Sequence, residues 1–148
     1  MNWKYFSKMG LALLVLALAL PSCYKESNWL DDNVTPGKGN FPVIATLTLV
    51  NGNMHKRGET AQLDLRYWSV DQIKEIQLNS IIGGVSTLVS TTPYTSNFAA
   101  DSQTDKLILD YPVPANLDPA VTKVSLEVKV INDNTLSRTS KVDITITN

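Results

Sequence analysis

The side chains that carry most enzyme chemistry are scarce in this sequence. Cysteine and histidine occur once each, as Cys23 and His55. A catalytic nucleophile needs a neighbouring base, a zinc site needs several Cys or His ligands, and a glycosidase needs two facing carboxylates. His55 lies within residues 51–58, which we expect to form a solvated loop, and the acidic residues are scattered over turns and strand ends. We therefore expect no enzymatic activity, no catalytic residue and no cofactor.

Two oxygen-rich segments, residues 101–105 (DSQTD) and 132–134 (NDN), are candidates for binding calcium. Calcium takes about six to eight oxygen ligands, several of them charged, and neither segment has the acidic spacing of an EF-hand loop. Asp and Asn favour turns because their side chains form hydrogen bonds with the local backbone. We expect turns at both places and no metal site.

Three aromatic residues, Trp68, Tyr94 and Phe98, are candidates for ligand binding. If Leu63 and Leu65 face the core of a strand, alternation places Trp68 on the opposite, solvated face. An exposed Trp can stack on a sugar ring or anchor a protein partner, and Tyr94 and Phe98 could extend its surface. The alternative is that Trp68 packs into the core.

The single cysteine follows a segment typical of secretion signals. Lys4 and Lys8 precede twelve uncharged apolar residues, 9–20. This run is too short for a membrane-spanning helix, which needs about 20 residues, but suits a signal peptide. The sequence Leu-Pro-Ser-Cys that ends at Cys23 resembles a bacterial lipobox, although its proline departs from the usual residue. The resemblance implies cleavage after residue 22 and lipid attachment, including palmitate, at Cys23, which anchors the protein to a membrane.

The residues after Cys23 are typical of a linker. Residues 24–42 show no hydrophobic periodicity and contain two Pro and two Gly. Tyr24 stands where Asp retains enterobacterial lipoproteins in the inner membrane, and Lys25-Glu26 resembles the charged export signal of surface lipoproteins from Bacteroides-type bacteria. These resemblances imply the outer membrane, with the protein facing the cell exterior. Trp29 is unusual in a linker and suits either a headgroup region or the domain surface.

Composition and charge exclude other classes of protein. The chain has 148 residues, of which 43% are hydrophobic, and its net charge is −1. This composition is ordinary for a globular protein, and the absence of a basic stripe argues against nucleic-acid binding. Removal of residues 1–22 takes away Lys4 and Lys8, which leaves 11 basic and 14 acidic residues and a net charge of −3.

From residue 43 onward the hydrophobic pattern has a period of two, which predicts β-strands and no helix. Seven runs show it, and the sixth is the clearest: Val124, Leu126, Val128 and Val130 alternate with polar residues. The seven runs lie at residues 43–49, 61–68, 72–80, 85–91, 106–111, 124–130 and 142–147. We place Val43, Ala45, Leu47 and Leu49 on one face of the first run.

The connections agree with this prediction. Gly83-Gly84 precedes the fourth run, Asn132-Asp133-Asn134 joins the last two, and three prolines lie in a crossing loop between the fifth and sixth. Strict alternation gives each sheet one buried and one solvated face, and two such sheets form a sandwich. We predict three segments: a signal peptide (1–22), the lipidated cysteine with a flexible tether (23–42), and an all-β, seven-stranded immunoglobulin-like β-sandwich (43–148).

Residues 50–59, 111–114 and 130–137 resemble parts of secreted immunoglobulin-like or polycystic-kidney-disease-like modules, which are common in Bacteroides-type surface lipoproteins. The resemblance implies a non-enzymatic role in adhesion, glycan binding or envelope assembly, with glycans or other envelope proteins as partners. Two more specific alternatives are a carbohydrate-binding component of a polysaccharide-uptake system and a structural subunit that acts by strand addition.

Overall fold

The computed structural model describes residues 37–147, so the predicted signal peptide, Cys23 and Trp29 lie outside the described residues. The described part of the chain consists of strands and connecting turns, and it contains no helix that could cross a membrane. Its strands are β1 (Val43–Leu49), β2 (Met54–Lys56), β3 (Thr60–Trp68), β4 (Ile73–Ile82), β5 (Val85–Pro93), β6 (Phe98–Ala99), β7 (Thr104–Pro112), β8 (Lys123–Asn132) and β9 (Ser137–Thr147).

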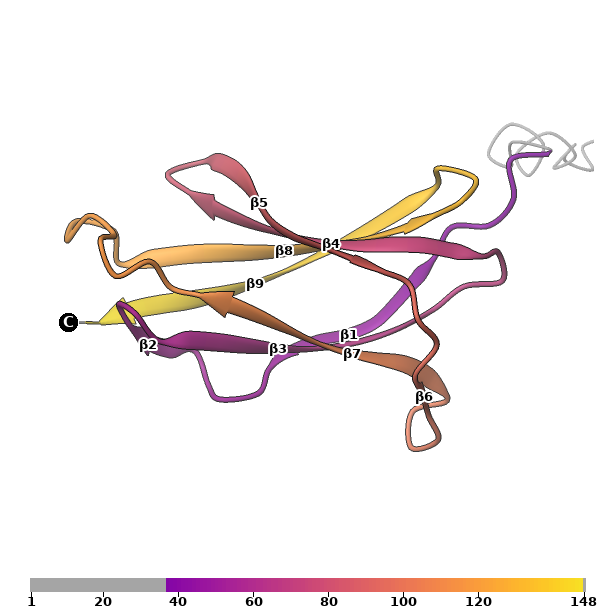
Figure 1. Ribbon diagram of the computed structural model, residues 1–148, viewed down its shortest axis with the longest axis horizontal. Coiled ribbons are helices and arrows are strands. Elements are labelled where there is room, and N and C mark those ends of the chain that lie inside the picture. Colours follow the sequence, from indigo (N-terminus) through magenta and orange to yellow (C-terminus); the bar gives the residue numbers. More distant parts are fainter. Residues whose placement is uncertain (1–36, 148) are drawn as a thin grey trace, which may run out of the picture. The chain divides into compact units, whose positions relative to one another are not determined.

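The strands form two sheets that face each other, which confirms the prediction of an all-β sandwich (Figure 1). One sheet has four strands in the order β1-β3-β7-β6, and the other has five in the order β2-β9-β8-β4-β5. All neighbouring strands are antiparallel except β2 and β9, which are parallel. The proline-containing connection between β7 and β8 crosses from one sheet to the other, as expected.

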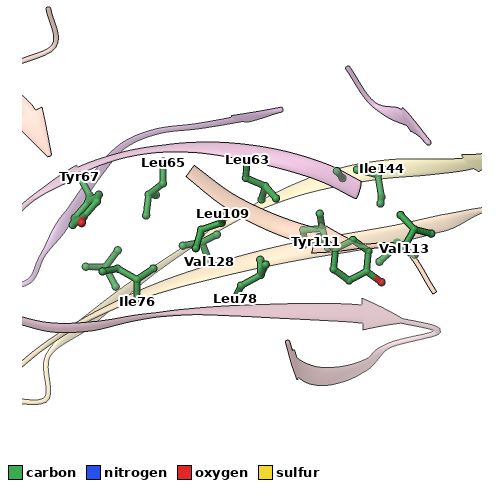
Figure 2. Packing of buried hydrophobic residues seen from close by; sticks show 14 of the residues in the cluster. Leu63, Leu65, Tyr67, Ile76, Leu78, Leu109, Tyr111, Val113, Val128 and Ile144 are labelled. Carbon is green, nitrogen blue, oxygen red and sulfur yellow. The ribbon is translucent and has the colours of Figure 1, made fainter. Parts of the chain in front are cut away.

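The core lies between the sheets and follows the alternation of the sequence. Leu63, Leu65 and Tyr67 of β3 point across the gap toward residues of the opposite sheet such as Leu78 and Val128 (Figure 2). Every second residue of β8 from Val124 to Val130 is fully buried, because this strand lies inside the larger sheet and one of its faces packs on the other sheet. The sequence therefore correctly predicted which face of each central strand is buried in the core.

The structure differs from the sequence prediction in three places. Nine strands are described, since β2 and β6 are too short to show an alternating pattern. The expectation that His55 is a solvated loop residue is wrong: it is 2% exposed, because β2 pairs with β9 and the His55 ring Nε2 lies 3.0 Å from the Gly52 carbonyl oxygen. Ala45 is exposed, because a bulge between Ile44 and Thr46 shifts the register of β1 and turns Ile44 toward the core.

Two connections show how local sequence fixes the sandwich. Gly83 and Gly84 have φ values of 57° and 85°, the left-handed conformation that a two-residue hairpin of type I′ requires at both central positions. At the crossing loop, the Arg57 guanidinium donates hydrogen bonds to the carbonyl oxygens of Leu117, Asp118, Pro119 and Val121 at 3.1–3.4 Å. The Arg57 side chain thus holds the connection between β7 and β8, which has few backbone hydrogen bonds of its own.

The residues just before β1 also contact the domain. Pro42 is buried, the Asn40 N–H donates to the Asp71 carboxylate, and the Asn40 carbonyl accepts a 2.9 Å hydrogen bond from Asn132 Nδ2. We placed these residues in the tether on the basis of composition, which does not reveal contacts made with residues 31 or 92 positions away.

Candidate functional site

The candidate site is a hollow of about 170 Å³ at the end of the sandwich where the described chain begins. The loop between β3 and β4 supplies half of its lining residues, and the rest come from the adjoining ends of β3 and β4, from Tyr94 after β5 and from Asp105 at the start of β7. The lining residues are Trp68, Ser69, Val70, Asp71, Gln72, Ile73, Tyr94 and Asp105. Ligand pockets for drug-sized molecules have volumes of about 300–1,000 Å³, so this hollow suits a single small group, such as one ring of a larger ligand.

Trp68 lies at the rim of this hollow, in the last position of β3. The buried residues of β3 alternate with its solvated ones, so Trp68 follows the fully buried Tyr67 and is 44% exposed. Its backbone pairs with that of Val43 at the start of β1. The exposure predicted for Trp68 from alternation is confirmed, whereas its role in binding stays a prediction.

Tyr94 contributes less exposed surface than we expected. It packs against the core, and its ring meets that of Tyr67 edge to face, with centroids 6.4 Å apart and planes at 79°. Its hydroxyl donates a 2.7 Å hydrogen bond to Asp105 Oδ2. Burial, and next the hydrogen bond to Asp105, raise the pKa of Tyr94, while burial, Asp105 and Tyr94 together raise the pKa of Tyr67 to about 12. Both phenols therefore stay neutral near pH 7.

Phe98 is 65% exposed but does not line the hollow. It begins β6, where its backbone pairs with that of Asp105. Of the three predicted binding residues, the structure thus brings Trp68 and Tyr94 to one hollow and places Phe98 beside it, at the edge of the four-stranded sheet.

The carboxylates of this end already have hydrogen-bond or ionic partners. Asp105 accepts hydrogen bonds from Tyr94, from Ser96 Oγ at 3.1 Å and from the Asn97 N–H at 2.8 Å. Asp101, in the segment considered for calcium, forms a 3.0 Å ion pair with Arg66. Among residues 37–147, no group of three or more His, Cys, Asp or Glu side chains is arranged to hold a metal ion.

Sequence analysis missed the polar residues that shape this end, above all Asp71 and Asn132. Asn132 is fully buried, and its Nδ2 donates to the Asn40 carbonyl at 2.9 Å and to Ser69 Oγ at 2.8 Å. A signal was present, because Asn132 continues the inward-facing series of β8 by one more step. We assigned it to a turn on the basis of its residue type alone.

Comparisons with known proteins find similarity to solved structures alone. No family model and no curated protein matches the chain. Among solved structures, the sporulation control protein Spo0M from Bacillus subtilis is 9% identical with a TM-score of 0.49, and the match covers 72% of this chain and 49% of Spo0M. CopC from Methylosinus trichosporium OB3b is 14% identical with a TM-score of 0.40, over 71% of this chain and 92% of CopC. The chain thus spans about half the length of Spo0M.

Proposed function

We propose that the protein is a non-enzymatic lipoprotein of the outer membrane, anchored through Cys23 and facing the cell exterior, with one immunoglobulin-like sandwich. The strand order supports the immunoglobulin-like assignment. If β1, β3, β7 and β6 correspond to strands A, B, E and D, the larger sheet contains G, F, C and an added C′ strand, as in that fold. The lipobox-like sequence before Cys23 supports the anchor.

The anchor is tested by labelling the wild-type chain with palmitate in a Gram-negative host. The wild-type protein should incorporate the label and partition into detergent, and Cys23→Ala should abolish both properties because it removes the only thiol. Label that persists in Cys23→Ala would contradict the anchor.

The function that the geometry supports best is binding of a glycan or another envelope component at the end that carries Trp68. The observation that carries this proposal is the exposed Trp68 at the rim of a hollow that also presents the polar groups of Asp71 and Gln72. Sugar sites combine an aromatic face with a few polar groups that fix orientation. A role in polysaccharide uptake would use the same surface.

The test compares Trp68→Ala with Ile108→Ala, since Ile108 of β7 is 41% exposed and therefore a matched control. Both variants should keep the wild-type melting temperature within a few degrees, since truncation of a partly exposed side chain costs far less than the roughly 3–5 kcal/mol of a buried aromatic residue. Only Trp68→Ala should lose binding to immobilised envelope glycans. Equal binding by both variants would refute the site.

A second candidate function, assembly by strand addition, is favoured by β5. This strand forms one edge of the five-stranded sheet, and no charged residue occurs between Val85 and Ala100. Edge strands usually carry charges that prevent pairing with other chains. The pairing of β4 with β5 shifts register between Leu78 and Asn79, and Pro93 at the end of β5 lacks an N–H donor. The regular part of the free edge is therefore confined to the first four residues of β5. Leu88→Lys should abolish such assembly, as measured by analytical ultracentrifugation, while leaving the fold intact.

A further inference from the structure

The described chain enters the domain at a fixed place, and the contacts that fix it are specific. Asp71 accepts hydrogen bonds from the Asn40 N–H and from Asn134 Nδ2, the latter at 2.9 Å, and the buried Asn132 holds the Asn40 carbonyl. Gly39 has a φ of 87°, and a Cβ at this position would collide with the Asp71 and Asn134 side chains. The described chain therefore begins at this end of the domain.

The same end carries a group of exposed apolar side chains, which we call the entrance surface: Phe41, Trp68, Val70 and Phe98, with exposed fractions of 56%, 44%, 71% and 65%. Four of the nine large hydrophobic side chains exposed among residues 37–147 thus lie here. Hydrogen bonds and strand pairing bring their segments together: Asn40 bonds to Asp71, and Phe98 pairs with Asp105 in the lining of the hollow. Figure 1 shows the chain entering at the same end as β6 and the connection between β3 and β4.

We propose that the entrance surface docks onto the interface of the bilayer to which Cys23 attaches. This inference rests on the proposed lipid anchor, and it takes the bilayer, rather than a glycan, as the envelope component that the surface around Trp68 contacts. Fourteen peptide links separate Cys23 from Gly37 and can span at most about 50 Å, so the anchor keeps this end within about 50 Å of its attachment point in the bilayer. Short connections produce effective concentrations in the millimolar range, so a weak contact is sufficient.

The chemistry of the entrance surface fits the headgroup region better than a charged partner. Trp is enriched at membrane–water interfaces, where its ring lies at headgroup level, and Phe is typical of the apolar side of surface-bound segments. The neighbouring carboxylates of Asp71, Asp101 and Asp105 have partners within the domain. Apolar burial would then drive docking, which should be insensitive to salt and not strengthened by anionic lipid.

The test places one fluorescent Trp at each end of the domain. The lipidated chain with Trp29→Phe, reconstituted into phosphatidylcholine vesicles, keeps Trp68 as its only Trp, because the proposed cleavage after residue 22 removes Trp3. The matched control adds Trp68→Phe and Leu88→Trp, because Leu88 is 56% exposed in β5, near the opposite end. Circular dichroism should show the same β-sheet content for both proteins.

We expect brominated acyl chains to quench the fluorescence of Trp68 at least about twofold more strongly than that of the Trp introduced at position 88. Only the emission maximum of Trp68 should shift to the blue when vesicles are present. Equal quenching of the two probes, or none, would overturn docking. Palmitate labelling separates the two proposals: loss of label refutes the anchor, whereas a labelled protein with unquenched Trp68 refutes docking only. A Trp68 that responds to soluble glycan but not to the vesicle would mean that the surface faces away from the membrane.

Discussion

Replacement of Val128 by Asp should nearly unfold the domain, because Val128 lies at the centre of the core. It is 0% exposed in β8, an inner strand of the five-stranded sheet, where its backbone pairs with Leu78 of β4 and Ser140 of β9. In Val128→Ala, loss of the two methyl groups costs about 1.6 kcal/mol by transfer, and the cavity left behind brings this to about 2–3 kcal/mol. A buried carboxylate without a partner adds several kcal/mol, which approaches the total stability of about 5–15 kcal/mol for a small domain.

The pH dependence separates the charge from the cavity. Burial raises the pKa of a carboxyl group, so the folded state of Val128→Asp binds a proton more tightly than the unfolded state. Its destabilisation should therefore shrink as the pH falls below the folded pKa, whereas the loss in Val128→Ala should not depend on pH. Urea unfolding of both variants between pH 4 and pH 8 measures the difference.

Lys129→Asp is the matched control, one residue further along the same strand. Lys129 belongs to the partly exposed face of β8 and pairs with Gln77 and Thr139. Its replacement should cost less than about 1 kcal/mol, as is usual for surface positions. Equal losses at Val128 and Lys129 would refute the register of β8 and with it the assignment of the core.

Three further changes probe other parts of the domain. Thr135 has a φ of 70°, which a β-branched residue adopts only under strain, so Thr135→Asn should raise the free energy of unfolding by about 1 kcal/mol in urea titrations. Arg57→Lys should cost about 1–3 kcal/mol and speed amide exchange in residues 117–121, because an ammonium group cannot replace the guanidinium donors. The hydrogen bond from Arg66, followed by the positive charge of Arg66, lowers the pKa of Asp64 from 3.8. The free energy of unfolding of the wild type should therefore exceed that of Asp64→Asn in full above about pH 5, and this difference should vanish as the pH falls through the lowered pKa.

The sandwich was predictable because long strands with one buried face leave a period of two in the sequence. Val124 to Val130 of β8 and Ala61 to Tyr67 of β3 alternate without interruption, and both strands lie where predicted. The period fails where the backbone departs from regular pairing. At Ala45 a bulge shifts the register, and at His55 a three-residue strand is too short to show any period.

The site was predictable only in part, for a related reason. The exposure of Trp68 follows from its place in β3, so alternation was sufficient to predict it. The residues around it come from loops, and loops carry no periodicity. Ser69 and Asn132 are 63 positions apart but form a hydrogen bond, and Tyr94 binds Asp105 although the neighbouring strands β5 and β7 belong to different sheets.

Asn132 holds the chain where it enters the domain, but it packs less favourably in the core than an apolar residue would. Valine fills the two preceding inward positions of β8, and an apolar side chain would continue the core. The amide instead leaves its buried Oδ1 without a partner within the described structure, and an unsatisfied buried acceptor costs about 1–3 kcal/mol. Its Nδ2 meanwhile holds Asn40 and Ser69, the residues that set where the chain enters and how the loop beside Trp68 lies. The residue thus contributes more to the placement of the entrance surface than to the sandwich itself.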